Sequence, residues 1–210
     1  MEVKRAKISS VGHYLPEYRL TNFELEKMVD TNDEWIRTRT GISERRILKD
    51  PTKASAFMGA EASKEALEEA GVDPMEIDLI IVATVTPDYL FPATACLVQE
   101  MIGAKKAFAF DVSAACSGFI YALTTGSAFI ESGQAKKVLV IGSDKMSSIL
   151  DYTDRTTCIL FGDGAGAVLL EESEDETGII NSIHYTEGDT NCSLYQHAGG
   201  SLNPATHDTV

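Results

Sequence analysis

The stretch FDVSAACSGFIYAL, residues 110–123, buries a cysteine where a strand-like run gives way to a helix-forming one. A cysteine attacks as a thiolate, and the unpaired N–H groups at a helix N-terminus stabilise that negative charge. Cys116 has this position, after Asp111 and before Gly118, among residues small enough for a sharp turn. The pattern is typical of a turn that presents a nucleophile beside an oxyanion-binding amide. It also fits a small core cysteine without a chemical role.

A second candidate site lies in DTNDEWIRTRTGISERR, which begins at residue 30. Trp35, the only tryptophan of the chain, is followed by Arg37 and Arg39. An aromatic plate beside guanidinium groups can stack a base and bind phosphates. The alternative is a core tryptophan with solvated arginines. The basic run continues to Arg45 and Arg46 and indicates a local positive potential in an acidic chain.

The remaining motifs favour structural roles. The glycines of FGDGAGAVLL match neither a dinucleotide fingerprint nor a phosphate-binding loop, so we expect close backbone approach there and a structural role for Asp163. Cys96, Cys158 and Cys192 lack the setting of Cys116. Without a CxxC pair or a histidine cluster, the sequence suggests neither a disulfide framework nor a metal site.

Composition narrows the possible partners. With 44% apolar residues among 210, the chain can bury a large core as one domain or two small ones. Its 18 basic and 32 acidic residues give a net charge of −14, which disfavours nucleic acid. The N-terminus does not resemble a signal peptide, so we expect a cytoplasmic protein. Residues 112–130 carry no charge, but hydroxyl groups and glycines interrupt them, so we predict a fully buried core helix and no membrane span.

Periodicity and end signals predict strands that alternate with helices, as in an α/β layered fold. Strands are expected within 3–16, 77–86, 106–112, 136–144, 158–173 and 178–189. Helices are expected at 23–30, 53–71, 91–104 and 117–133, with a short turn around Trp35. Thr21 or Asn22 and Asn32 or Asp33 are candidate caps, Gly71 and Gly103 candidate helix ends, and Pro92 an early helical residue.

The chain resembles the β-ketoacyl-acyl-carrier-protein synthase III enzymes, which initiate type II fatty acid synthesis. Six motifs carry the resemblance, in the family's order: TNDEWIRTRTGISERR, FPATAC, AFDVSAACSGFIYAL, VIGSDKMS, DYTDRTT and FGDGAGAVLL. The resemblance implies a thiolase-like layered fold, with a mixed, mostly parallel sheet flanked by helices. Residues 1–172 would be the first half of a duplicated fold. Residues 173–210, whose last part reads as a polar loop, would begin the connection to a second half absent from this chain.

By this resemblance, Cys116 is the acyl-accepting nucleophile. Trp35 and Arg155 would sandwich the adenine of coenzyme A, Thr31 would touch that base, and Arg39 would meet the phosphates. Acyl-coenzyme A would be a substrate, and no tightly bound cofactor is implied.

The resemblance also implies a homodimer. Phe91 would reach across the dimer interface and form the bottom of the partner's acyl pocket. Met146 and Phe161 would line that pocket. Thr156 stands where the family often has glycine, so the coenzyme A tunnel would be narrower or shifted there.

The implied reaction is a decarboxylating condensation of the acyl-enzyme with malonyl-acyl-carrier protein. The family's catalytic His and Asn, and a glycine of its oxyanion hole, lie in the second half of the fold. His184, His197 and His207 do not match that His motif. We therefore expect the isolated chain to accept an acyl group without condensing it.

Two alternatives remain. The first is another cysteine-dependent enzyme of the thiolase superfamily, such as a hydroxymethylglutaryl-coenzyme A synthase or a polyketide starter enzyme. The second is a noncatalytic half that folds with a separate partner chain as a binding or structural subunit.

Overall fold

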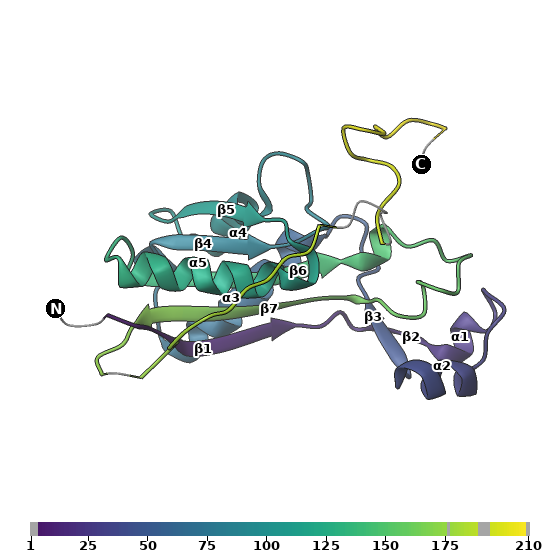
Figure 1. The fold of residues 1–210 in the computed structure, drawn as a ribbon, viewed down its shortest axis with the longest axis horizontal. Coiled ribbons are helices and arrows are strands. Elements are labelled where there is room, and N and C mark those ends of the chain that lie inside the picture. The colour runs from purple at the N-terminus through teal and green to yellow at the C-terminus, as the bar shows by residue number, and fades with distance from the viewer. Residues whose placement is uncertain (1–3, 176, 189–193, 209–210) are drawn as a thin grey trace. The chain divides into compact units, whose positions relative to one another are not determined.

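The computed structural model describes residues 4–175, 177–188 and 194–208. The chain forms two compact units, residues 1–180 and residues 181–210. All helices and strands of the described residues belong to the first unit (Figure 1). The described residues of the second unit form only turns and loops.

The elements follow one another along the first unit as the labels of Figure 1 show. The strands are β1 (Ala6–Tyr14), β2 (Tyr18–Thr21), β3 (Glu44–Ile47), β4 (Leu79–Ala83), β5 (Phe108–Val112), β6 (Lys137–Lys145) and β7 (Asp163–Glu172). The α-helices are α1 (Asn22–Leu25), α2 (Asp33–Thr40), α3 (Ser55–Ala70), α4 (Thr94–Ile102) and α5 (Gly118–Glu131). Short 3-10 turns are η1 (Pro74–Glu76), η2 (Ala115–Ser117) and η3 (Met146–Ser148).

A mixed sheet in the order β1-β7-β6-β4-β5 forms the centre of the first unit. β4 is parallel to β5 and β6, whereas β7 is antiparallel to β6 and β1. Every residue of β4 is buried, as expected for a continuous apolar strand covered on both faces. The layered α/β fold is confirmed, with a sheet that is as much antiparallel as parallel.

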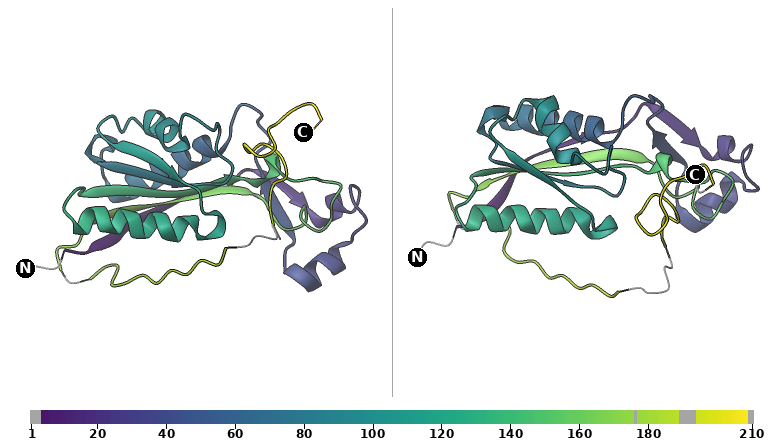
Figure 2. Two further views of the ribbon diagram at one scale, coloured as in Figure 1. Left: turned by 45° about the horizontal axis from the view of Figure 1, so that its top comes forward. Right: turned by 90° about the horizontal axis from the view of Figure 1, so that it is seen from above.

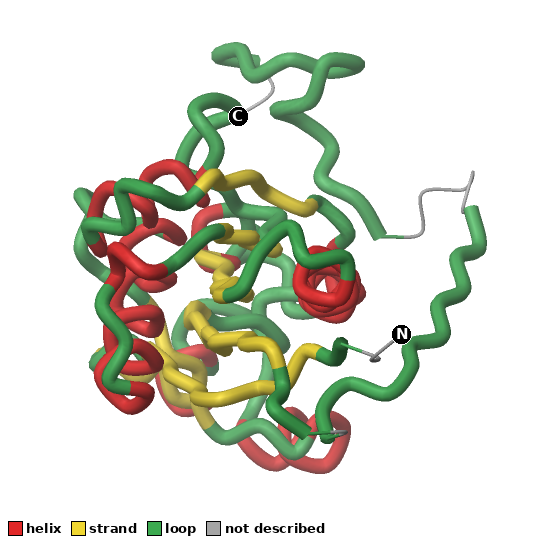
Figure 3. The backbone as a smooth tube through the Cα atoms, turned by 90° about the vertical axis from the view of Figure 1, so that its left-hand side faces the viewer, coloured by secondary structure: helices red, strands yellow, loops and turns green. Residues whose placement is uncertain are grey.

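Helices cover both faces of this sheet. α3 and α4 pack against one face, where Ile80 and Val82 of β4 point into their core cluster. α5 packs against the other face over Leu79 and Ile81. Figure 2 shows the sheet between these helices, and in Figure 3 α5 is seen end-on beside it. The alternation of side chains along each strand therefore supplies two separate cores.

A smaller two-stranded sheet, β2 with β3, lies with α1 and α2 beyond the ends of β6 and β7 (Figure 1). Its core cluster includes Leu20, Leu25, Ile36 and Ile159. The sequence did not indicate these two strands, because each has only four residues and β3 contains two arginines. α2 is an eight-residue helix, longer than the predicted short turn.

Several predicted end signals are confirmed. Thr21 caps α1 in a capping box with Glu24, and the Asn32 side chain accepts the N–H of Trp35 at the start of α2. Gly71 and Gly103 end α3 and α4 in the left-handed conformation. These positions follow from local chemistry alone.

Three predictions are wrong. α4 begins at Thr94, so Pro92 lies before the helix. Residues 178–188 form no strand among the described residues. The predicted fully buried helix is covered on one face only, since Ile120 of α5 is 49% exposed. Within the described residues, no helix has both the length and the apolar character that a bilayer crossing requires.

β1 and α3 approach so closely that only glycine fits at one contact. A Cβ on Gly12 would collide with the backbone of α3, at 2.6 Å from Ala66 N and nearer still to Ala62 O. The buried Ser10 hydroxyl donates to Ala66 O at 2.7 Å in the same contact. Backbone atoms cannot move aside as flexible side chains can, so the helix would have to shift.

We expect Gly12→Ala to lower the free energy of unfolding by about 2–4 kcal/mol, because it overpacks a backbone contact. Gly166→Ala is the matched control on the facing strand, since its Cβ would meet nothing closer than 3.9 Å. Urea unfolding followed by circular dichroism measures both variants. Equal stabilities of the two would contradict this account of the β1–α3 contact.

Candidate active site

Three parallel strands end at the same edge of the central sheet. Ala83, the last residue of β4, pairs with Val112 of β5, and β6 runs parallel on the other side of β4. The connection after β5 carries Cys116, the one after β4 carries Phe91, and β6 runs directly into Met146. Binding and catalytic residues of α/β sheets collect at such carboxyl ends.

Cys116 lies in η2, directly before α5. Ala115 has φ of 45°, and it is the only non-glycine residue with positive φ among the described residues. A Cβ on Gly118 would lie 3.3 Å from the Ala83 side chain, so the first turn of α5 packs closely on β4. The expectation of a buried thiol is wrong, because Cys116 is exposed on this strained turn.

Two carboxylates at strand ends hold the neighbouring loops. Asp111 accepts the N–H groups of Thr94 (2.7 Å) and Ala95 (2.8 Å), and so caps α4. Asp144, near the end of β6, accepts the N–H of Val85 at 2.8 Å. Asp144 is not among the residues predicted from the sequence, although an acidic residue at the carboxyl end of a strand is a pattern that indicates such a position. Both carboxylates hold loops at the sheet edge that carries Cys116.

Trp35, Arg39 and Arg155 come together, although Arg155 is distant in sequence. The guanidinium carbon of Arg39 lies 4.6 Å from the Trp35 ring centroid, and that of Arg155 lies 5.2 Å from it. Both are cation–π distances. A base stacked between Trp35 and Arg155 would need about 7 Å, so Arg155 would have to move outward by about 2 Å.

Thr31 and Asp30 border this group. Arg155 Nη1 donates to the Asp30 carbonyl oxygen at 2.8 Å, which ties the 151–160 turn to the segment before α2. The Thr31 hydroxyl is buried and has no hydrogen-bond partner within the described part of the chain. An unpaired buried hydroxyl costs about 1–3 kcal/mol, so a ligand atom that pairs with it would gain affinity.

The three predicted pocket residues lie at the same edge of the sheet. Lys145 pairs with Asp163 at the last step of the β6–β7 ladder, so Met146 and Phe161 leave the sheet together. Both are half-buried. Phe91 is 85% exposed and joins none of the core clusters of the described residues.

The glycine-rich segment has the structural role expected of it. A Cβ on Gly162 would lie 3.0 Å from the Arg46 carbonyl oxygen, so this segment passes close to β3. The buried Asp163 carboxylate accepts N–H groups from Leu48 and Ser147, each at 2.8 Å. These contacts join the small sheet to the central sheet.

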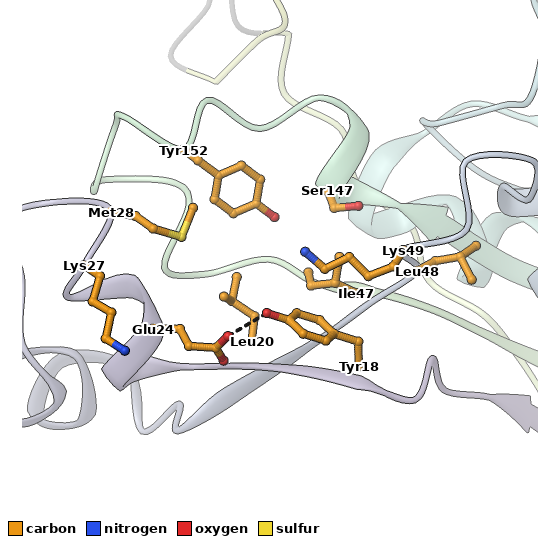
Figure 4. Close-up of a pocket in the computed structure, with 10 residues that line it drawn as sticks. All are labelled: Tyr18, Leu20, Glu24, Lys27, Met28, Ile47, Leu48, Lys49, Ser147 and Tyr152. Atoms are coloured by element: carbon orange, nitrogen blue, oxygen red, sulfur yellow. Dashed lines mark hydrogen bonds between the residues drawn. The ribbon is translucent and has the colours of Figure 1, made fainter.

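A cavity of about 560 Å³ opens beside the small sheet (Figure 4). Lys27, Lys49 and Tyr152 are among its lining residues, and none of the predicted site residues lines it. Lys49 Nζ lies 4.3 Å from the Tyr18 ring centroid, and Tyr18 donates to Glu24 at 2.6 Å. That hydrogen bond raises the pKa of Tyr18 and lowers the pKa of Glu24. The internal pairing of these polar groups suggests no particular ligand.

The other thiols differ from Cys116 in exposure. Cys96 is half-buried and Cys158 is fully buried, while Cys192 lies outside the described residues. Burial raises the pKa of Cys158, so at a given pH it holds less of the reactive thiolate. No group of three or more His, Cys, Asp or Glu side chains is arranged to hold a metal ion in the described ranges.

Comparison with known proteins decides the family. The sequence profile of 3-oxoacyl-[acyl-carrier-protein] synthase III matches residues 110–188. The β-ketoacyl-[acyl-carrier-protein] synthase III of Chlorobium luteolum is 59% identical over 207 residues, which cover 98% of this chain and 63% of that protein. The chain belongs to the synthase III family.

Solved structures of synthase III enzymes share the fold. The enzyme of Aquifex aeolicus is 60% identical, with a TM-score of 0.79 over 81% of this chain and 55% of that chain. Another 3-oxoacyl-(acyl-carrier-protein) synthase III, at 34% identity, has a TM-score of 0.91 over 97% of this chain and 61% of its own. The present chain therefore spans less than two thirds of the length of these synthase III proteins.

We expect iodoacetamide to alkylate Cys116 first and Cys158 last. Cys116 is exposed at a helix start, whereas Cys158 is buried with a raised pKa. Limited labelling followed by peptide mass spectrometry gives the order, and the urea-unfolded chain serves as the control in which the order should vanish. Labelling of Cys158 as fast as Cys116 in the folded chain would be inconsistent with the structure.

Proposed function

We propose that this chain supplies the acyl-accepting part of a cytoplasmic β-ketoacyl-acyl-carrier-protein synthase III. The reaction joins a short acyl group from acyl-coenzyme A to malonyl-acyl-carrier protein and so initiates type II fatty acid synthesis. The proposal rests on the exposed Cys116, held on a strained turn at the start of α5. Family membership supports the reaction type.

Acyl transfer uses the Cys116 sulfur as nucleophile. The thiolate attacks the thioester carbonyl carbon, and the negative charge moves to the carbonyl oxygen, which the Cys116 backbone N–H would stabilise. Collapse of this intermediate breaks the bond between the carbonyl carbon and the coenzyme A sulfur. Coenzyme A leaves as a thiolate and takes a proton from water, and the acyl group stays on Cys116.

Coenzyme A recognition would use the group around Trp35. Its adenine would enter between Trp35 and Arg155, with the unpaired Thr31 hydroxyl at its edge. The phosphates would meet Arg39, whose guanidinium is exposed beside the ring. No tightly bound cofactor is part of this proposal.

Condensation would follow on the acyl-enzyme. Malonyl-acyl-carrier protein would lose carbon dioxide, and the resulting enolate would attack the carbonyl carbon on Cys116. We propose that the residues for this step lie in the part of the family's fold beyond these 210 residues. We also propose a homodimer in which the exposed Phe91 reaches the acyl pocket of the partner, next to Met146 and Phe161.

Incubation with acetyl-coenzyme A should add the mass of one acetyl group to the peptide that contains Cys116. Intact-mass and peptide mass spectrometry measure this. Cys116→Ala should take no acetyl group, and Cys96→Ala is the matched control that should react as the unaltered chain does. Acetylation of Cys116→Ala to the same extent would remove Cys116 from the reaction.

Trp35→Ala should weaken coenzyme A binding by about tenfold or more, since base stacking on an aromatic side chain contributes about 1–3 kcal/mol. Isothermal titration calorimetry measures the Kd. Phe23→Ala removes another exposed aromatic side chain, from α1, and should leave the Kd unchanged. An unchanged Kd in a folded Trp35→Ala variant would rule out the adenine site.

A further inference from the structure

Arg45 is a buried charge that the proposed reaction leaves unexplained. It lies on β3 and is only 4% exposed. Along β3 the buried residues alternate with half-buried ones, so Arg45 faces the same side as the core residue Ile47. Burying an ionised group costs several kcal/mol unless its hydrogen bonds are made. The hydrogen-bond partners of Arg45 therefore show which segments this buried charge holds together.

One branch of contacts leads from Arg45 to the turn that carries Arg155. Arg45 Nε donates to the Ile159 carbonyl oxygen at 2.8 Å, and Arg45 Nη2 donates to the same oxygen. Ile159 is buried four residues after Arg155, at the end of the 151–160 turn. The guanidinium fork thus holds the end of the turn, while the bond of Arg155 to Asp30 holds its middle.

A second branch leads from Arg45 to α2, which carries Trp35 and Arg39. Arg45 Nη1 donates to Asn22 Oδ1 at 2.6 Å. The fully buried Asn22 donates through Nδ2 to Asp33, the first residue of α2, at 2.8 Å. Asn22 Nδ2 also donates to the carbonyl oxygen of Ile42, just beyond the end of α2, at 2.8 Å. Asn22 thus connects Arg45 with both ends of this helix.

We propose that Arg45 is a positioning residue for the coenzyme A site, because it joins the helix that carries Trp35 and Arg39 to the turn that carries Arg155. Only a planar guanidinium can reach the Ile159 carbonyl and the Asn22 side chain together. Lysine keeps the charge but has no such fork. This inference rests on the proposed coenzyme A site for its effect on binding, but the arrangement around Trp35 can be tested without a ligand.

The test compares Arg45→Lys with Arg46→Lys in the unliganded chain. Arg46 is the adjacent residue of β3, and its side chain donates to the Pro16 carbonyl oxygen, away from the site. Trp35 is the only tryptophan of the chain, so its fluorescence reports on this site alone. We expect Arg45→Lys to raise the acrylamide quenching constant of Trp35 by about twofold, because the local structure opens, and Arg46→Lys to leave it unchanged.

Coenzyme A affinity gives the second measurement. Loss of the two contacts should raise the Kd for coenzyme A by about tenfold in Arg45→Lys, since unpaired buried partners cost about 1–3 kcal/mol. The rate of Cys116 alkylation should stay unchanged, because the other end of the site does not depend on Arg45. If Arg45 only supports the fold as a whole, Arg45→Lys should change the Kd and the Cys116 alkylation rate together, and this result would overturn the proposal.

Asn22→Asp is a second variant in case Arg45→Lys does not fold. Its carboxylate still accepts from Arg45 but can no longer donate to Asp33 or to the Ile42 carbonyl oxygen. Both contacts with the ends of α2 are therefore lost, while the bonds of Arg45 to Ile159 remain. It too should raise Trp35 quenching and the Kd. Unchanged quenching and Kd in a folded variant would overturn the proposal. If the unaltered chain does not bind coenzyme A, the proposed function fails, and the quenching comparison still decides the role of Arg45.

Discussion

The candidate site depends on the contact between the first turn of α5 and β4. Gly118 lets the helix backbone lie against Ala83, and a Cβ at that position would crowd the sheet. The chain must therefore turn sharply between the end of β5 and this contact, and Ala115 adopts a left-handed conformation to do so. Cys116 is exposed as a consequence of this turn. The position of Cys116 thus follows from the packing of α5 against the sheet.

The surrounding loops are ordered by buried or half-buried polar groups. Asp111 caps α4, Asp144 holds the loop after β4, and Asp163 joins β3 to the end of β6. Each carboxylate accepts backbone N–H groups that a loop would otherwise leave unpaired. Arg45 donates to the Ile159 carbonyl oxygen and to the side-chain oxygen of Asn22, which would otherwise be unpaired. The site is therefore built on a rigid sheet edge with loops tied to it, which is how α/β folds combine precise placement with variable chemistry.

Several helix ends and the position of Cys116 could be predicted from local chemistry. The caps at Thr21 and Asn32, the end of α3 at Gly71 and the position of Cys116 before α5 follow from residues within one or two turns. The exposure of Cys116 cannot be predicted in this way, because the small residues beside it in the sequence are equally compatible with a buried thiol. The basic run from Arg37 to Arg46 predicts one positive patch. The structure separates it, since Arg39 stacks on Trp35 while Arg45 is buried and bonded to two neutral oxygens. Whether each arginine is exposed or buried depends on the alternation of side chains along the strand and on partners distant in sequence. A short motif shows neither. The pairing of Arg155 with Trp35 likewise joins residues far apart in the sequence, and only the family resemblance predicts it.

The central claim is that one coenzyme A molecule reaches both the Trp35 group and Cys116. The most direct test is a titration with acetyl-coenzyme A in which Trp35 fluorescence and the initial rate of Cys116 acylation are measured on the same samples. The account predicts that both signals saturate with the same half-maximal concentration. Acylation that rises linearly through the range in which Trp35 is already saturated would show that the two sites bind different molecules, and would contradict it.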